Sequence, residues 1–147
     1  MSETQTPEAK PLRERRQVAA LPWRHGPDGL EIMLVTSRET RRWVVPKGGL
    51  MAGLTDAQAA AQEALEEAGI EGEIGAEAIG EFRYLKVLKR RAPRWCRVSV
   101  YPLRVVTELD AWQEAHERDR AWFDRDTAAD LVAEPDLRDL IRVFQPG

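Results

Sequence analysis

The chain has 147 residues, a net charge of −3, and 43% hydrophobic and 32% charged residues, which fits one soluble domain with a single core. No apolar run approaches the roughly 18 residues of a membrane span, no secretory signal is visible near Met1, and the single cysteine, Cys96, excludes an internal disulfide. We therefore expect a cytoplasmic protein, a monomer or homodimer, without a membrane partner.

The chain opens with a segment that predicts a flexible tail. Residues 1–14 are mostly polar and include two prolines, a composition that buries little apolar surface. We therefore expect a single folded domain that spans residues 15–147.

Two segments near the start of this domain predict a β-hairpin. Residues 17–23 and 31–36 are rich in apolar side chains, and a turn with Gly and Pro at 25–29 separates them. Pro22 lacks an amide hydrogen, so we expect the first strand at a sheet edge or beside a bulge. A polar loop and a short strand at 43–45 follow.

The next element is a helix with signals at both of its ends. Thr55 and Gln58 form a Thr-x-x-Gln capping box, which predicts the start of the helix. Gly69 stands where a helix C-terminus favours a residue that tolerates positive φ. Small side chains recur on one narrow stripe of this helix, at Ala57, Ala61, Ala64 and Ala68. We expect this stripe to approach a sheet closely.

The second half of the chain predicts further strands and then two helices. The expected strands are residues 72–79, 81–88, 95–106 and 119–123, and the expected helices are residues 126–132 and 135–144. Pro102 again indicates an edge or a bulge in the long strand. This order of elements predicts a mixed sheet between helical layers, an α/β/α sandwich of the α/β (α+β) class.

Three glutamates gather near the end of the central helix. Glu63 and Glu67 are four residues apart and Glu66 lies one turn from Glu63, so the carboxylates share one face. Like charges in one patch repel, and a bound cation would relieve that repulsion. Hard oxygen ligands favour Mg²⁺, Ca²⁺ or Mn²⁺ over soft metals. The alternative is a solvated acidic helix face that binds nothing.

The stretch from Gly48 to Ile70 resembles the Nudix box, Gly-x5-Glu-x7-Arg-Glu-U-x-Glu-Glu-x-Gly-U, in which U is an aliphatic residue. The matching residues are Gly48, Glu63, Ala64, Glu66, Glu67, Gly69 and Ile70. Two positions depart from the pattern, because Leu54 replaces its first Glu and Gln62 replaces its Arg. The acid and the base are lost together, so neither is left as a charge without its partner.

The resemblance implies a Nudix fold and a metal-dependent hydrolase of phosphoanhydride bonds, with Mg²⁺ or Mn²⁺ as cofactor. It implies that Glu63, Glu66 and Glu67 bind the metal and act in catalysis. The turn at Gly48 would add a backbone carbonyl ligand. Which glutamate serves as the base stays open.

Segments outside the box resemble diphosphoinositol polyphosphate phosphohydrolases and diadenosine polyphosphate hydrolases. This similarity spans roughly residues 16–132 and implies a small phosphoanhydride substrate held by basic side chains. The residues implied are Arg38, Arg42, Lys47, Arg118 and Arg120. Arg118 and Arg120 would share one face of a strand, and Glu117 would supply a late carboxylate. The alternatives are an exposed turn position for Lys47 and ordinary surface roles for the others.

Basic residues crowd the segment 83–97, which holds seven Lys or Arg side chains and no acid. Such a segment would attract a polyanion, or it would be a solvated hairpin tip. Trp112 falls in a predicted loop, where its ring would either pack against the protein or stack on a substrate base.

Three functions remain open. The first is a hydrolase of nucleoside-diphosphate-linked or polyphosphate compounds, with diadenosine polyphosphates or inositol pyrophosphates favoured. The second is a non-catalytic Nudix-like module that binds nucleotides or polyphosphate, which Leu54 and Gln62 favour. The third is an RNA 5′-pyrophosphohydrolase, although the net charge of −3 and the lack of an interleaved aromatic and basic platform argue against nucleic acid. The retained glutamates favour the first, since a pure binder has no need of repelling carboxylates.

Overall fold

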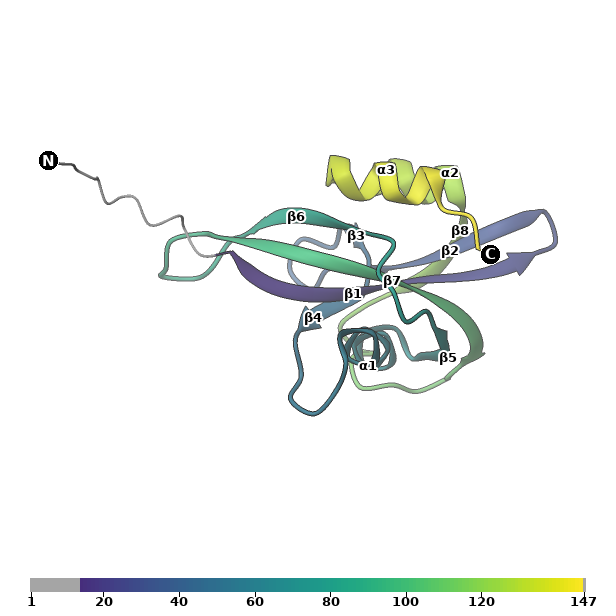
Figure 1. Cartoon of the computed structure of the whole chain (residues 1–147), viewed down its shortest axis with the longest axis horizontal. Helices are drawn as coiled ribbons and strands as arrows, with labels where there is room; N and C mark the ends of the chain where they lie inside the picture. Colours follow the sequence, from purple (N-terminus) through teal and green to yellow (C-terminus); the bar gives the residue numbers. More distant parts are fainter. Residues whose placement is uncertain (1–13, 147) are drawn as a thin grey trace, which may run out of the picture.

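The computed structural model describes residues 14–146, so the predicted tail lies almost entirely outside the described residues. The strands are β1 (Arg15–Gly26), β2 (Gly29–Thr36), β3 (Trp43–Val44), β4 (Lys47–Gly49), β5 (Ile70–Ile74), β6 (Gly80–Lys86), β7 (Arg94–Glu108) and β8 (Arg120–Asp124). The helices are α1 (Asp56–Ala68), α2 (Arg125–Leu131) and α3 (Pro135–Val143), as Figure 1 shows.

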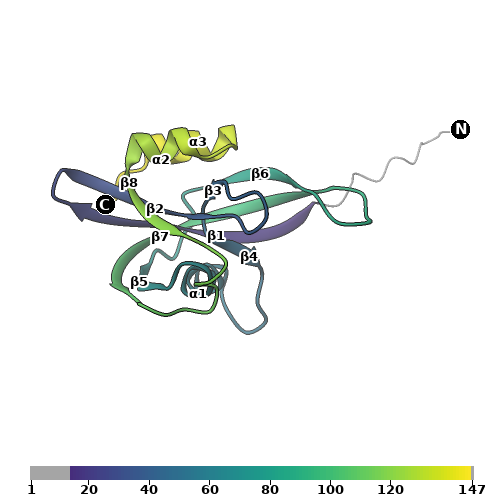
Figure 2. The same ribbon diagram turned by 180° about the vertical axis from the view of Figure 1, so that it is seen from behind.

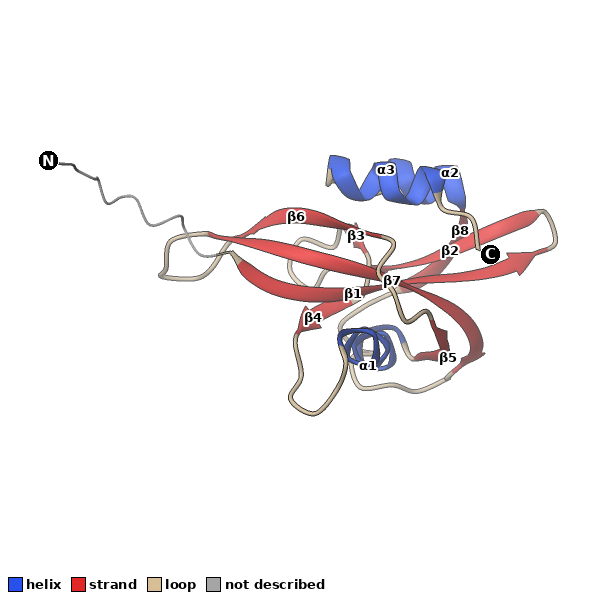
Figure 3. Cartoon of the chain, in the orientation of Figure 1, coloured by secondary structure: helices blue, strands red, loops and turns tan. Residues whose placement is uncertain are grey.

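The strands of this described range form one mixed sheet (Figure 3). Strand β1 runs antiparallel to β2 and parallel to β7. Helix α1 covers one face of the sheet, while α2 and α3 cover the other, in both views of the chain (Figures 1 and 2). The predicted α/β/α sandwich with a mixed sheet is therefore confirmed. Between residues 14 and 146, the helices are too short or too polar to cross a membrane.

Each face of the sheet carries its own core, because alternate side chains of a strand point to opposite faces. On the side of α2 and α3, Leu137 and Ile141 are fully buried in a cluster that contains Phe82. On the other side, Ala60 and Ala64 of α1 are fully buried over the sheet. The sheet is thus held between two apolar layers, and α1 is fixed firmly against it.

Helix α1 begins and ends as the sequence predicts. The Thr55 hydroxyl accepts a hydrogen bond from the Gln58 amide at 3.1 Å, and the Gln58 side chain accepts one from the Thr55 amide at 2.9 Å. Gly69 has a φ of 66°, the left-handed geometry that glycine adopts without strain. The buried alanines are Ala57, Ala59, Ala60, Ala64 and Ala68. The contact face is therefore broader than the predicted stripe, and Ala61 lies beside it.

The two prolines of the long strands lie in the sheet interior, so the prediction of edge positions is wrong. Along one side of β1, residues 17–19 pair with β4, whereas residues 23–26 pair with β2. Pro22 lies at this change of partner. Pro102 has the same place in β7, between residues that pair with β6 and residues that pair with β5. A residue without an amide hydrogen is tolerated there because the ladder is interrupted anyway.

The strand predicted at residues 72–79 is displaced. The structure has β5 at Ile70–Ile74, and residues 75–79 form a connection to β6. Gly72 lies at a register shift between β5 and β7, where a Cβ atom would come within 1.9 Å of the carbonyl oxygen of Arg104. This bulge depends on the pairing of β5 with β7, which the local sequence around Gly72 does not show.

Candidate active site

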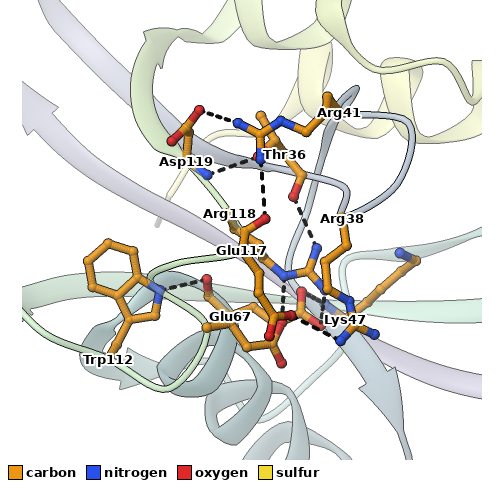
Figure 4. A network of polar contacts seen from close by, with 10 residues as sticks. Thr36, Arg38, Arg41, Lys47, Glu67, Trp112, Glu117, Arg118 and Asp119 are labelled. Atoms are coloured by element: carbon orange, nitrogen blue, oxygen red, sulfur yellow. Dashed lines mark hydrogen bonds and ion pairs between the residues drawn. The ribbon is translucent and has the colours of Figure 1, made fainter.

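A cavity of about 590 Å³ opens where α1, β4, the β2–β3 loop and the loop before β8 meet. Its acidic lining residues are Glu39, Glu63, Glu67 and Glu114, and its basic lining residues are Arg15, Arg38, Arg42, Lys47, Lys86 and Arg118. Gln17, Ser37, Gly48 and Tyr84 also line it. Carboxylates of the helix therefore face a wall of cations across one space, and part of this network is drawn in Figure 4.

The turn at Gly48 receives the Glu63 side chain directly. A Cβ atom added to Gly48 would lie 2.1 Å from Glu63 Oε2, a distance that no side chain could keep. The adjacent Lys47 amide donates a hydrogen bond of 3.3 Å to Glu67 Oε1. Strand β4 therefore holds two carboxylates of α1 against its backbone, which is how the glycine of the sequence motif acts locally.

Burial is the main cause that raises the pKa values of both carboxyl groups, and neighbouring acids add to it most clearly at Glu63. The pKa of Glu63 rises to about 7, first through burial and then through the charges of Glu67, Glu66 and Glu114. The pKa of Glu67 rises to about 6 because its burial outweighs the opposing charges of Arg118 and Lys47. Both carboxyl groups are therefore held in surroundings that disfavour their charged forms.

Glu66 lies outside the cavity lining. Its Oε2 atom accepts a hydrogen bond of 2.8 Å from Gln62 Nε2, one turn earlier on the helix. Gln62 and Leu54, the two departures from the motif, line a separate opening of about 360 Å³ between α1 and β5. The predicted trio is therefore divided, with Glu63 and Glu67 in the cavity and Glu66 held beside it.

Glu114 is a cavity residue that the sequence analysis missed. It comes from the loop before β8, and its Oε1 atom accepts a hydrogen bond of 2.6 Å from Arg118 Nε. The spacing of four residues between Glu114 and Arg118 was the available signal. Glu117, which was predicted to supply the late carboxylate, instead pairs with Arg38 at 3.2 Å on the exposed rim. This placement agrees with the surface alternative for Glu117, and Glu114 is the carboxylate of this loop that lines the cavity.

Arg118 is a buried organiser of the cavity wall. It lies 3.5 Å from Glu67 Oε2, and its Nη1 donates to the carbonyl oxygen of Thr36 at 3.0 Å, as Figure 4 shows. Together with the bond to Glu114, these contacts involve all three nitrogen atoms of the guanidinium. Arg118 thus reaches the predicted cavity, but its donors are largely occupied by the protein.

Arg120 lies outside the cavity lining, so the structure does not place it with the other residues predicted to bind substrate. Its guanidinium donates to the carbonyl oxygens of Ala68, Gly69 and Leu109, at 2.8, 3.2 and 2.7 Å. Arg118 precedes β8 whereas Arg120 begins it, so the two residues do not share a strand face. Arg120 secures the last turn of α1.

Trp112 packs against this same helix end. Its indole Nε1 donates a hydrogen bond of 3.0 Å to the carbonyl oxygen of Glu67 (Figure 4), and the Arg120 guanidinium lies 4.0 Å from its ring centroid. The ring also covers Gly69, where a Cβ atom would come within 2.6 Å of it. The packing alternative for Trp112 therefore holds, and the stacking of a substrate base on it does not.

Three further predicted residues, Lys47, Arg38 and Arg42, line the cavity. Lys47 is partly buried in β4, and its Nζ lies 4.9 Å from the centroid of the Tyr84 ring. Burial is the main cause that lowers the pKa of Lys47, with Glu67 opposing it. The alternative of an exposed turn lysine is therefore excluded.

The cavity fits a hard divalent cation in its chemistry. Its acidic donors are oxygens, and a divalent cation would stabilise the charged forms of Glu63 and Glu67 that burial disfavours. Between residues 14 and 146, however, no three His, Cys, Asp or Glu side chains are already gathered at metal-binding distances. The cavity therefore offers suitable oxygen ligands, but its described side chains are not gathered around one metal position.

The sandwich with α1 seated on β4 is the fold of known Nudix structures. An Ap4A hydrolase of C. elegans, solved as a binary complex, superposes with a TM-score of 0.63 at 20% identity, over 87% of this chain and 93% of the other. The NUDIX domain of NrtR from Shewanella oneidensis, complexed with ADP ribose, superposes with a TM-score of 0.63 at 16% identity, over 94% and 92%. At this level of identity the likeness concerns the fold.

The sequence comparison assigns the family. The NUDIX domain model matches residues 14–144, and the chain therefore belongs to the Nudix family. Nudix hydrolase 21, chloroplastic, of Arabidopsis thaliana is 27% identical over 134 residues, which are 88% of this chain and 66% of the relative. Human diphosphoinositol polyphosphate phosphohydrolase 3-beta is 32% identical over 111 residues, 74% of this chain and 63% of the relative. The chain thus spans about two thirds of these relatives' lengths.

Proposed function

We propose that this protein is a pyrophosphohydrolase that cleaves a phosphoanhydride bond with the help of Mg²⁺ or Mn²⁺. The single observation that carries the proposal is the two-sided cavity, in which Glu63 and Glu67 face Arg42, Lys47 and Arg118. A phosphoanhydride is an anion that needs cations on one side and a polarised water on the other. Family membership supports the same activity.

Each side of the cavity has its own task in this reaction. Glu63, Glu67 and the turn at Gly48 would hold the divalent cation, with Glu114 or Glu66 completing its ligands. The bound cation supplies a water of lowered pKa and shields the phosphate charge. Arg42 and Lys47 bind phosphate oxygens, while Arg118 keeps Glu67 and Glu114 in place.

The substrate class we propose is a compound with several phosphates, either a diadenosine polyphosphate or an inositol pyrophosphate. The cationic wall supports it, because Arg15 lines the main cavity and also a recess of about 390 Å³ at the β6–β7 hairpin. That recess is further lined by Lys89, Arg91 and Arg94. The basic segment of the sequence thus continues the cavity, and a long polyanion would follow it. The names of the human relative and the C. elegans structure point to the same two substrates.

A second candidate function is a non-catalytic module that binds the same compounds. One observation favours it, since Gln62 holds Glu66 beside the cavity instead of within it. The raised pKa values of Glu63 and Glu67 favour the enzyme, because a binder of anions gains nothing from buried carboxylates. The cytoplasmic location, the oligomeric state and the alternative of RNA as substrate stay predictions.

The test is turnover with a panel of substrates. Purified protein is incubated with Mg²⁺ or Mn²⁺ and with diadenosine polyphosphates, nucleotide sugars, inositol pyrophosphates and 5′-triphosphorylated RNA, and the phosphate products are measured. We expect turnover of a diadenosine polyphosphate or an inositol pyrophosphate, and a loss on the order of 10²-fold in Glu67→Gln. The matched control is Glu77→Gln, an exposed acid of the β5–β6 connection. Binding without turnover would instead establish the second candidate.

A further inference from the structure

Glu134 carries a buried carboxylate that takes no direct part in the proposed reaction. It stands at the N-cap position of α3, yet its side chain makes no capping hydrogen bond there. Only 8% of the residue is exposed. Its Oε2 atom instead accepts a hydrogen bond of 3.0 Å from Nη2 of Arg42, on the loop between β2 and β3. The carboxylate of Glu134, at the start of α3, therefore reaches Arg42 in the cavity wall.

Arg42 is fixed at both of its ends. Its amide donates to the Ser37 hydroxyl at 3.1 Å, and its carbonyl oxygen accepts from the Ser37 amide at 2.8 Å. The preceding residue, Arg41, has a φ of 57°, a left-handed geometry that costs a non-glycine residue free energy. The loop accepts this strain, and Glu134 holds the far end of the Arg42 side chain. Such a doubly fixed arginine has lost most of its freedom before any ligand arrives.

The ion pair is not arranged for maximal stability. Nη1 of Arg42 and Oε1 of Glu134 are both buried, and neither has a hydrogen-bond partner within the described residues. A two-bond arrangement would have satisfied both atoms. A buried charge held by one bond is a poor source of stability, because desolvation offsets most of the attraction. The Arg42 side chain meanwhile stays 40% exposed and lines the cavity.

We propose that Glu134 is a positioning residue, which holds the Arg42 guanidinium in the cavity wall so that it binds an anionic oxygen of the substrate phosphate chain. The inference rests on the proposed function in one respect, because Arg42 is assigned there to phosphate binding. Glu134 acts through Arg42, its hydrogen-bond partner, and touches no substrate itself. Its removal therefore weakens phosphate binding and leaves the chemical step unchanged.

The first test measures binding without turnover. Inorganic tripolyphosphate is titrated by calorimetry, in the presence of EDTA, into wild type, Glu134→Ala, Arg42→Ala and the double variant. We expect about tenfold weaker binding in each single variant, as for the loss of one charge-assisted bond. The double variant should bind no more weakly than Arg42→Ala alone. Asp136→Asn, an exposed acid on the same helix turn, serves as the control and should bind like wild type.

A role for Glu134 in stability alone gives a different result. It would lower the Tm of Glu134→Ala and leave its Kd for tripolyphosphate equal to that of wild type, which overturns the proposal. Additive losses in the double variant, or no tripolyphosphate binding by wild type, also overturn it. If Glu134→Ala does not fold, the isosteric Glu134→Gln carries the same cycle, with a smaller expected weakening.

The second test separates this inference from the proposed function. With diadenosine tetraphosphate and Mn²⁺, Glu134→Ala should raise KM about tenfold and leave kcat within about twofold of wild type. An unchanged KM beside normal wild-type turnover overturns the role of Glu134 and leaves the proposed function standing. Tripolyphosphate binding that depends on Glu134, without turnover of any substrate by wild type, supports the inference and refutes the hydrolase.

Discussion

Gln62 donates a hydrogen bond of 2.8 Å to Glu66, and this contact separates Glu66 from the two glutamates that line the cavity. The residue pair spans one turn of α1 and contains Gln62, one of the two departures from the Nudix box, while the other departure, Leu54, precedes the helix. The three acids of the box are therefore unequal in this protein, although the sequence presents them as one cluster.

This inequality predicts graded effects of substitution. Glu66→Gln should reduce kcat by less than about tenfold, because the side chain keeps its bond to Gln62 and is outside the cavity. Glu67→Gln should reduce kcat by on the order of 10²-fold or more, since Glu67 is buried at the centre of the cavity. Steady-state kinetics and Mn²⁺ titration of the two variants test the order. Equal losses would mean that Glu66 swings into the cavity when the cation binds.

A methyl group at Gly48 should disable the site without unfolding the protein. In Gly48→Ala the new Cβ atom would meet the Glu63 carboxylate at about 2 Å, so this flexible side chain must leave the turn. We expect kcat to fall on the order of 10²-fold, as for a lost electrostatic group, with a Tm within a few degrees of wild type.

Gly49 provides the matched control for this substitution. A Cβ atom on Gly49 would have its nearest contact at 4.0 Å, with Nη2 of Arg15. Gly49→Ala should therefore keep most of the activity. Equal inactivation of both variants would show that the flexibility of β4, and not the contact with Glu63, is what the site requires.

Arg120 should act on stability and not on substrate binding. Arg120→Ala removes three hydrogen bonds to backbone carbonyl oxygens at the end of α1. We expect a loss of about 2 kcal/mol in the free energy of unfolding, and an unchanged KM for the folded fraction. Denaturant unfolding and steady-state kinetics measure the two quantities. Arg104→Ala, which breaks an exposed ion pair with Glu73, should leave the free energy of unfolding close to that of wild type. A raised KM in Arg120→Ala would restore its substrate role.

The raised pKa of Glu63 predicts how stability changes with pH in the metal-free protein. Its pKa is 4.5 when unperturbed and about 7 in the folded state, so the folded state binds this proton more tightly. The corresponding stabilisation is complete below about pH 4.5 and is lost as the pH rises through about 7. Glu67, with a pKa of about 6, contributes in the same direction.

Glu63→Gln should remove its part of this dependence. In EDTA at about pH 8 the variant should be more stable than wild type by about 1 kcal/mol, a value reduced for the partial exposure of the group. The difference should shrink toward about pH 4.5. Thermal unfolding across this range measures it, and added Mn²⁺ at about pH 8 should raise the Tm of wild type more than that of the variant. A wild type that is the more stable protein at high pH would contradict the repulsion inferred for the cavity.

Local signals in the sequence were enough to predict the helix, the hairpin and the layered fold. The capping box at Thr55 and the glycine at Gly69 depend on neighbours a few residues away, and both ends of α1 were predicted correctly. Glu63 and Glu67 were likewise found by their spacing on one helix. What the sequence could not show were partnerships over long distances, such as Arg42 with Glu134 or Trp112 with the Glu67 carbonyl.

The loop before β8 shows the reason most clearly. Arg118 and Arg120 are equivalent by residue type and spacing, yet one enters the cavity and the other holds α1. Which of them does so depends on where β8 begins, and that start is set by pairing with β2, some 85 residues earlier in the chain. Residue type alone cannot distinguish an arginine that lines the cavity from one that holds the end of a helix.

The prolines inside β1 and β7 bear on how the cavity is built. Each proline lies where a continuous strand changes from one neighbouring strand to another. Close to Pro22, the amide of Ala20 donates a hydrogen bond to the carbonyl oxygen of Pro46, which immediately precedes Lys47. At this exchange of partners β4 pairs with β1, and this pairing places Lys47 in the lining of the cavity. Proline usually interrupts a β-sheet, and here Pro22 lies beside the strand pairing that brings Lys47 to the cavity.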